Sequence, residues 1–226
     1  DPFHPVIKDG KLYGRGSTDM KGGIAATIVA AKALKLEGVN LPGTVSFSFV
    51  PDEEYGGPTG TRFLLGQKKV KADYCIIAEP TGGDDFYNGH KGSLWMEITT
   101  YGKAAHGARP WKGVNAFENM VEVVQEINAN LKPKLLSGGN IEINNQTVGR
   151  KGSITLGGKV TTGESLNVVP AQCTMTIDRR IAPGEEVNEV IGEFSNILES
   201  LKQRDPQFRG ELNVFFGYNA CTVPTD

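Results

Sequence analysis

Predominantly apolar runs alternate with a helical pattern over the first 90 residues. The runs 44–50 and 74–78 predict buried strands because few polar residues interrupt them. An alanine-rich stretch over 20–36, ended by Gly38, predicts a helix, and a shorter helix is expected over 60–65. This alternation of strands and helices favours a mostly parallel sheet covered on both faces, which is an α/β architecture.

A different pattern begins near residue 91. Its two longer helical segments place apolar residues at helical spacing, and strands surround them. The order β-α-β-β-α-β is that of a ferredoxin-like layer. The predicted elements are a strand over 93–101, a helix over 113–131, strands over 152–161 and 167–178 joined by a turn around Gly163, a helix over 185–202 and a strand over 211–216.

The second pattern predicts a domain with its own core. We therefore expect a first domain over 1–90, a second over 91–218, and a return towards the first over 219–226. A chain of 226 residues is long enough for one large domain or for two of ordinary size.

Composition is that of a soluble globular protein, with 38% hydrophobic and 22% charged residues. A formal charge of -2 provides no basic surface for nucleic acid or for anionic lipid, and no apolar run approaches the roughly 18 residues of a membrane span. The first residues lack the features of a secretory signal and an initiator Met, so we expect a cytoplasmic protein of which this chain is a part. Three cysteines, Cys75, Cys173 and Cys221, are far apart in the sequence. Because Cys75 and Cys173 lie in strand-like runs, they favour buried structural thiols over a zinc-thiolate site.

Acidic residues stand at the ends of the apolar or glycine-rich runs. Glu53 and Glu54 follow the first predicted strand, Glu79 follows the second, and Asp19 closes a glycine-rich turn. Ligands gather at the carboxyl ends of parallel strands, and carboxylates converging there repel one another unless protons or cations neutralise them. The sequence therefore predicts a divalent metal site with one or two ions.

Each acidic residue also has a simpler interpretation. Asp19 is placed where a helix cap is common, and capping and metal binding are compatible if one oxygen serves each. Adjacent glutamates such as Glu53 and Glu54 are often merely solvated. In an extended segment, however, their side chains point opposite ways, so that one can bind a metal while the other acts as a general base.

The sequence resembles the dinuclear zinc hydrolases of the acetylornithine deacetylase and succinyl-diaminopimelate desuccinylase family, which also includes aminoacylases and glutamate-releasing carboxypeptidases. The matching segments follow one another in the right order over nearly the whole chain, and their combination is far more specific than any one of them. They are 1–3, 12–23, 52–54, 78–81, 102–106, 113–116, 167–170 and 178–180.

The resemblance implies a role for each matching residue. Asp19 corresponds to the carboxylate that bridges two zinc ions, Glu53 to the general base, and Glu54 and Glu79 to ligands of one zinc each, with cobalt or manganese as substitutes. His106 corresponds to a lid histidine that reaches the active site of a neighbouring subunit and stabilises the developing oxyanion.

Two further lid residues, Asn167 and Arg180, are similar to those that hold the substrate carboxylate. The neighbouring Arg179 leaves the choice of arginine open, and a surface salt bridge is the simpler interpretation for either. His4 and His90 match no ligand position and are expected to be structural.

The chain departs from the family pattern in one respect. The zinc-binding histidine of a His-x-Asp motif and the last zinc-binding histidine are absent, so the chain resembles a central fragment with half a catalytic domain and an intact inserted lid. The resemblance implies a zinc hydrolase of small N-acylated amino acids or peptides that forms a homodimer through the lid. The alternative is a non-catalytic dimerisation or ligand-binding fragment, and we expect the isolated chain to bind zinc poorly and to be inactive.

Overall fold

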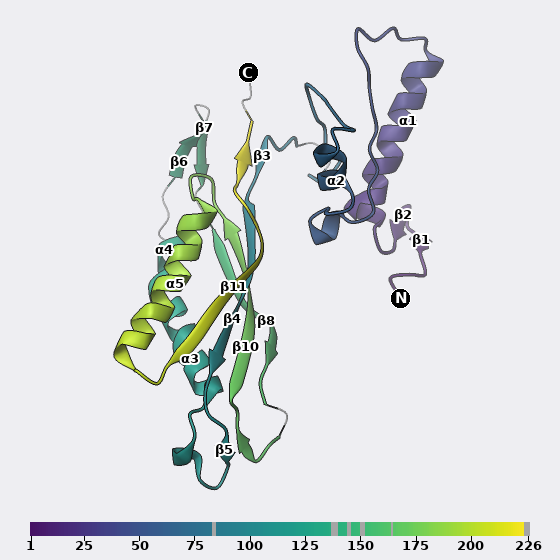
Figure 1. The fold of residues 1–226 in the computed structure, drawn as a ribbon. Helices are drawn as coiled ribbons and strands as arrows, with labels where there is room; N and C mark the ends of the chain where they lie inside the picture. Colours follow the sequence, from purple (N-terminus) through teal and green to yellow (C-terminus); the bar gives the residue numbers. More distant parts are fainter. Residues whose placement is uncertain (83–84, 137–139, 144–145, 150–151, 164, 224–226) are drawn as a thin grey trace. The chain divides into compact units, whose positions relative to one another are not determined.

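The structure is a computed structural model that describes residues 1–82, 85–136, 140–143, 146–149, 152–163 and 165–223. The chain divides into two compact units, unit 1 (Asp1–Phe86) and unit 2 (Tyr87–Asp226), and each is described by itself (Figure 1). No helix in the described part of the chain is long and apolar enough to cross a membrane.

Unit 1 contains the two helices that the sequence predicts. The longer, α1 (Gly23–Leu36), follows a π-helical turn over Ser17–Gly22, and the shorter is α2 (Thr61–Gly66). An antiparallel hairpin of β1 (Val6–Lys8) and β2 (Lys11–Tyr13) precedes them.

The two strands predicted in unit 1 are wrong as assigned. Neither 44–50 nor 74–78 forms a strand, and the only strands among the described residues of unit 1 are β1 and β2. Their apolar side chains are largely exposed, with Phe47 at 47% and Ile76 at 89%. Apolar content favours a strand only where a neighbouring strand supplies hydrogen bonds, and none of the described residues pairs with these segments.

Unit 2 is built on a four-stranded sheet with the order β11-β4-β10-β8, in which every neighbouring pair is antiparallel (Figure 1). The element order along this part of the chain is the predicted β-α-β-β-α-β, with a few short additions. The four strands are β4 (Gly92–Tyr101), β8 (Ser153–Thr161), β10 (Gln172–Ile181) and β11 (Arg209–Tyr218).

The first helical segment of unit 2 is longer than the sequence predicts. It begins at α3 (Ala116–Glu126), passes through a π-helical turn and ends with α4 (Lys132–Leu136). Asn115 caps its start, since the side-chain oxygen accepts hydrogen bonds from the N–H groups of Phe117 at 3.0 Å and Glu118 at 3.4 Å. Pro133 does not end the segment, and it lies just after the π-helical turn Ile127–Leu131, the kind of irregularity that accompanies prolines inside helices.

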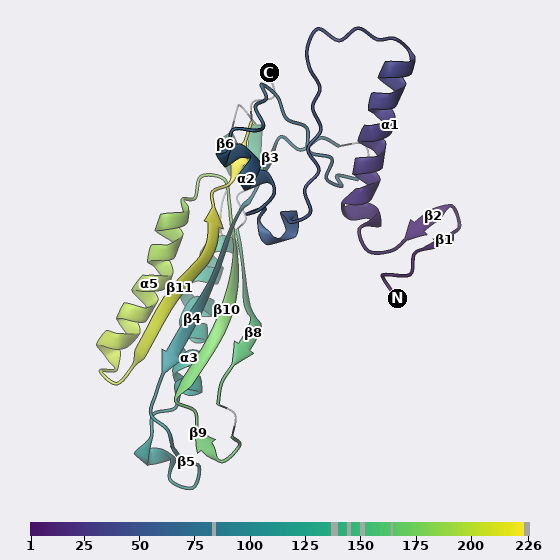
Figure 2. The same ribbon diagram turned by 45° about the vertical axis from the view of Figure 1, so that its right-hand side comes forward.

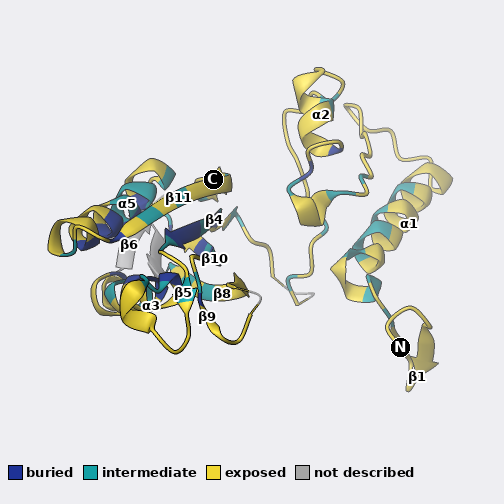
Figure 3. Cartoon of the chain, turned by 60° about the horizontal axis from the view of Figure 1, so that its bottom comes forward, coloured by how far each residue is buried: buried dark blue, intermediate teal, exposed yellow. Residues whose placement is uncertain are grey.

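The second helix, α5 (Val187–Arg204), lies with α3 against one face of the sheet (Figure 2). Alternate residues of β4 and β10 point to this face, so their side chains and the apolar stripes of both helices form a single core (Figure 3). The fully buried members include Leu94, Met96, Ile98, Val123, Ile127, Cys173, Ile181 and Phe194.

Short strand pairs surround this sheet. The strand predicted over 167–178 is divided, because Pro170 has no N–H to donate and its carbonyl instead accepts a hydrogen bond from Ala116 at 2.9 Å. The pairs are β5 (Ala105–His106) with β9 (Val168–Val169), β3 (Gly89–His90) with β12 (Cys221–Thr222), and β6 (Asn140–Ile143) with β7 (Gln146–Gly149). Position 164 of the predicted turn and 224–226 of the predicted return segment lie outside the described residues.

Candidate functional site

Asp19 lies in the turn before α1 rather than at its cap. The π-helical turn begins after Gly16, whose φ of 77° suits glycine, and α1 starts four residues beyond Asp19 without a side-chain cap. The peptide bond between Asp19 and Met20 is cis. The capping interpretation of Asp19 is therefore wrong, and its exposed carboxylate is left to other partners.

Glu79 is brought to this turn by a close backbone approach. A side chain at Gly23 would collide with the carbonyl oxygen of Ala78, so only glycine allows α1 to start directly against the 78–79 segment. In its protonated form the Glu79 carboxyl can donate a hydrogen bond to the Asp19 carboxylate, which helps to raise the pKa of Glu79. Two acidic positions that are 60 residues apart in the sequence thus become neighbours.

Glu53 and Glu54 lie in a loop that Asp52 organises. The Asp52 carboxylate accepts hydrogen bonds from the backbone N–H of Thr59 at 2.7 Å, from the Thr59 hydroxyl at 2.6 Å and from the N–H of Gly60 at 3.0 Å. The Thr59 hydroxyl contributes most to lowering the pKa of Asp52. This fixed charge anchors both ends of the loop that presents the two glutamates.

The two glutamates are not in the extended segment that the sequence predicts. They begin the 3-10 helix Glu53–Tyr55, in which successive side chains are rotated by roughly 120° rather than pointing opposite ways. Both side chains are exposed, so each can serve a different partner, as the sequence interpretation requires.

Three acidic side chains act electrostatically on Glu79. Partial loss of hydration contributes most to raising the pKa of Glu79, followed by the charges of Asp19 and Glu53 and by the hydrogen bond that protonated Glu79 donates to Asp19, with Glu54 adding least. Like charges at this range favour either a bound proton or a bound cation. The charges of Asp19, Glu53 and Glu54 thus act on Glu79, and a common metal site for the four carboxylates stays a prediction.

The acidic side chains are suitable ligands for a divalent cation, but they are not arranged around a common position for one. Carboxylate oxygens bind zinc. A positive ion would also reduce the repulsion between the neighbouring carboxylates that raises the pKa of Glu79. Among the described residues, however, no group of three or more His, Cys, Asp or Glu side chains is placed to hold a metal. The positions of Asp19, Glu54 and Glu79 thus provide the ligand types without a closed coordination shell.

In unit 2, His106 and Asn167 lie side by side. They belong to adjacent strands or turns, since β5 pairs with β9 and the N–H of Gly107 donates to the Asn167 carbonyl at 2.7 Å. His106 is exposed, and its Nδ1 accepts a hydrogen bond from the N–H of Ala108 at 3.1 Å. The neutral ring then carries its proton on Nε2, which is free to donate to a negatively charged oxygen.

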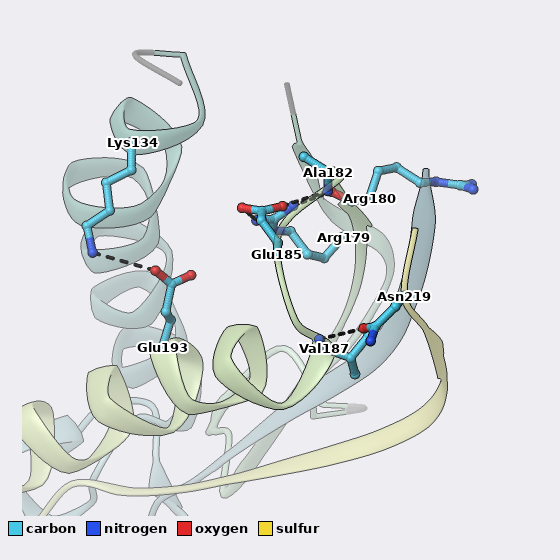
Figure 4. A network of polar contacts seen from close by, with 8 residues as sticks. All are labelled: Lys134, Arg179, Arg180, Ala182, Glu185, Val187, Glu193 and Asn219. Atoms are coloured by element: carbon cyan, nitrogen blue, oxygen red, sulfur yellow. Dashed lines mark hydrogen bonds and ion pairs between the residues drawn. The ribbon is translucent and has the colours of Figure 1, made fainter. Parts of the chain in front are cut away.

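The structure distinguishes Arg179 from Arg180. Arg179 is 1% exposed, and its guanidinium donates to Glu185 at 2.7 Å and to the Arg180 carbonyl. Arg180 points away from Arg179 (Figure 4). It is exposed and forms an ion pair with Asp178 at 3.0 Å. Arg179 is therefore a structural residue, and Arg180 is the arginine that a substrate can reach.

Arg180 is far from Asn167 in the same chain. Asn167 precedes β10, whereas Arg180 lies eight residues along that strand from Gln172, a distance of roughly 27 Å at about 3.4 Å per residue. Within one chain, Asn167 and Arg180 therefore cannot both hold one substrate carboxylate, although the sequence resemblance implies that both residues do so.

The other two histidines lie outside these groups. His4 contacts Asp1 at 2.7 Å, and the His90 ring packs edge-on against Tyr218 at 5.8 Å. Sequence reasoning did not assign the anchoring role of Asp52. The sequence feature that could have indicated this role is a threonine and a glycine, Thr59 and Gly60, a few residues after Asp52.

A protein-family comparison matches residues 1–194 to peptidase family M20/M25/M40. A succinyl-diaminopimelate desuccinylase from Buchnera aphidicola subsp. Cinara cedri is 39% identical over 133 residues, which are 56% of this chain and 35% of that protein. A protein of the same name from Coxiella burnetii is 30% identical over 234 aligned positions, covering 96% of this chain and 58% of that protein.

The solved structure of a tripeptidase from Staphylococcus aureus shares the fold, with a TM-score of 0.71 at 17% identity over 97% of this chain and 55% of that chain. The chain spans between about a third and three fifths of the curated relatives' length in these two matches. The family match includes all four acidic positions, His106, Asn167 and Arg180. The chain therefore belongs to peptidase family M20/M25/M40.

Proposed function

We propose that the protein is a zinc-dependent hydrolase that cleaves the amide bond of small N-acylated amino acids or peptides. The observation that supports it best is the packing of the Asp19 turn against Glu79, with Glu53 and Glu54 close enough to affect the Glu79 pKa. The relatives named as desuccinylases make substrates such as succinyl-diaminopimelate or acetylornithine reasonable members of the class.

In this proposal Asp19, Glu54 and Glu79 would hold two zinc ions, with Asp19 as the ligand common to both, Glu54 as a ligand of one and Glu79 as a ligand of the other; cobalt or manganese would substitute. Zinc, when bound, lowers the pKa of a water to about 7 and polarises the scissile carbonyl. Glu53 takes the proton of the attacking water and later passes it to the leaving amine.

Unit 2 supplies the remaining groups in this proposal. It acts as a ferredoxin-like lid inserted in the catalytic domain, and two copies form a homodimer through it. The exposed Nε2 of His106 donates to the oxyanion, and Asn167 assists it. Because Arg180 lies at the opposite end of β10, Arg180 and the pair His106–Asn167 of one chain serve different active sites of the dimer. We place the protein in the cytoplasm.

The test is hydrolysis of a panel of N-acylated amino acids with added zinc or cobalt, using the protein in its longest expressed form. Glu53→Ala should lower kcat by about 10²–10⁴-fold while metal content is unchanged, because the base is lost and the ligands remain. Glu37→Ala, at the end of α1, is the matched control and should retain full turnover. Near-normal turnover of Glu53→Ala would remove Glu53 from the base role.

A non-catalytic ligand-binding or dimerisation function is the second candidate. One observation favours it, namely that no group of described side chains is placed to hold a metal. Metal analysis separates the two candidates. Two zinc ions per chain together with hydrolysis support the enzyme, whereas ligand binding without stoichiometric metal or turnover supports the alternative.

A further inference from the structure

A cavity of about 250 Å³ lies in unit 2, on the face of the sheet that the helices cover. The described residues that line it come from α4 and the turn before it, from α5 and the loop before it, and from the neighbouring strands β8 and β10. Sites for drug-sized ligands measure roughly 300–1,000 Å³, so this cavity has the size for a small metabolite.

A buried ion pair fixes the floor of the cavity. The Glu185 carboxylate accepts hydrogen bonds from Arg179 at 2.7 Å and from the N–H of Ala182 at 2.7 Å, so both of its oxygens are engaged. A side chain at Gly152 would collide with the Arg179 guanidinium, so only glycine fits there. Arg179 is enclosed and shapes the cavity rather than contacting a ligand. The cavity is therefore formed in advance, which lowers the cost of binding.

A second ion pair stands at the exposed rim of the cavity. Lys134 of α4 and Glu193 of α5 point toward one another, with Nζ 3.7 Å from Oε1 (Figure 4). This separation is longer than a hydrogen bond. The two side chains are 65% and 37% exposed, and exposed ion pairs contribute little to stability. Contacts with a ligand can therefore replace contacts within this pair at low cost.

Aliphatic side chains line the space between the rim and the floor. They are Leu131, Leu135 and Ile154. Leu131 belongs to the core of unit 2, and Ile154 packs against it. An aliphatic group that enters the cavity would leave water for this apolar wall, which is favourable.

We propose that this cavity binds a free α-amino acid with an aliphatic side chain. The ammonium group of the ligand contacts the Glu193 carboxylate, its carboxylate contacts the Lys134 ammonium, and its side chain packs against Leu131, Leu135 and Ile154. The two charges of an α-amino acid are held one carbon atom apart, a spacing comparable with that of the Lys134–Glu193 pair. The ligand can therefore lie antiparallel to the pair, so that each charge meets its opposite.

Ligands with one charge fit the cavity less well. A carboxylate without an ammonium group would face the negative Glu193 beside Lys134, and an amine without a carboxylate would face the positive Lys134. The inference does not depend on the proposed function, because the cavity contains none of the residues to which that function assigns a role.

Equilibrium dialysis with radiolabelled L-leucine tests the proposal, using the protein in its longest expressed form. EDTA is present, so that binding through a metal does not contribute. We expect saturable binding of L-leucine. As competitors, N-acetyl-L-leucine, L-leucine amide and glycine lack the ammonium group, the carboxylate and the side chain, respectively. Each should compete at least about tenfold more weakly than unlabelled L-leucine.

Charge variants locate the ligand at the rim. Lys134→Met and Glu193→Gln should each weaken L-leucine by about tenfold or more, because each leaves one ligand charge without its partner. Lys202→Met and Glu199→Gln make the same substitutions at exposed positions of α5 and should leave binding unchanged.

A size variant locates the ligand inside the cavity. Leu135→Phe fills part of the space and should weaken L-leucine by about tenfold or more, while Leu136→Phe, at the neighbouring exposed position, should not. Circular dichroism checks that each variant is folded. The charge variants lie at the rim, so they still decide the question if Leu135→Phe does not fold.

Three results would overturn the inference. They are the absence of saturable L-leucine binding at millimolar concentration, equal competition by L-leucine and N-acetyl-L-leucine, and unchanged binding in both Lys134→Met and Leu135→Phe, which would place the ligand elsewhere. The proposed hydrolysis requires a metal and this binding does not. Binding in EDTA without hydrolysis after zinc is added contradicts only the proposed function, and hydrolysis without this binding contradicts only the inference.

Discussion

The three cysteines differ in burial, and burial controls their reactivity. Cys173 is fully buried in the core, as predicted, and desolvation raises the pKa of its thiol. The prediction of a buried thiol is wrong for Cys75, which is exposed like Cys221 because the 74–78 segment does not form a buried strand. Since the thiolate is the nucleophile, iodoacetamide at pH 8 should modify Cys173 more than about tenfold more slowly than the other two. Peptide mass spectrometry of the native protein measures this, and urea should equalise the rates. Equal rates in the native protein would contradict the buried position.

A second prediction at this scale concerns Glu79, whose pKa is higher in the folded chain than its ordinary value of 4.5. The folded state binds this proton more tightly, so the stabilisation is complete below pH 4.5 and is lost as pH rises through the folded pKa. Glu79→Gln should therefore raise the unfolding temperature of the metal-free protein at pH 7 and have little effect at pH 4. Circular dichroism in EDTA measures it.

The control for this change is Glu37→Gln in the same unit, which should give no such pH-dependent gain. Since Glu79 is exposed, added salt should reduce the effect. A destabilised Glu79→Gln variant at pH 7 would mean that hydrogen bonding of Glu79, rather than repulsion, dominates at this position.

Residue identities select four acidic positions, but not the way in which Glu79 is held beside the Asp19 turn. Asp19, Glu53, Glu54 and Glu79 could be selected from their places after apolar or glycine-rich runs. The contact of Gly23 with Ala78 depends on a close approach between segments far apart in the sequence. Such an approach leaves no periodic pattern, so sequence reasoning could not assign it.

At the scale of elements, α3 depends on its cap. Asn115→Ala removes the acceptor for the N–H groups of Phe117 and Glu118 and should lower the free energy of unfolding by about 1 kcal/mol. Urea unfolding followed by Trp95 emission in the Trp111→Phe background measures the change. Asn213→Ala, at an exposed position of β11, is the control and should cost less. An equal effect of both substitutions would show that the cap contributes little.

The elements of unit 2 were predictable because each buries one face against a shared core. Apolar and polar residues alternate along β4 and β10, and apolar residues recur at helical spacing along α5, because one face of each element is buried. In unit 1, the runs 44–50 and 74–78 are apolar but unpaired, because strand formation depends on a partner that local composition does not specify. The same reason explains why the two-residue pairs β5–β9 and β3–β12 were not predicted.

For the whole molecule, we predict a homodimer formed through an edge of the unit 2 sheet. Both β8 and β11 are edge strands, and charged residues on an edge prevent pairing between chains. Val160→Lys on β8 should convert the dimer to a monomer if β8 is the interface, while Val214→Lys on β11 should not. Light scattering over a dilution series measures both. A monomeric unsubstituted protein, or the reverse response of the two variants, would reject β8 as the interface.

The length of β10 has a consequence for how this fold can vary. The strand separates Asn167 and His106 at one end from Arg180 at the other. In the proposed two-fold assembly, the length of β10 would therefore set the distance between these two groups of each copy. Adding or removing one residue would turn every later side chain to the opposite face. Lengthening by two residues would keep the faces but move Arg180 by about 7 Å. Substrates of different length would therefore be accommodated by insertion or deletion of two residues in β10. Insertion or deletion of a single residue would be selected against.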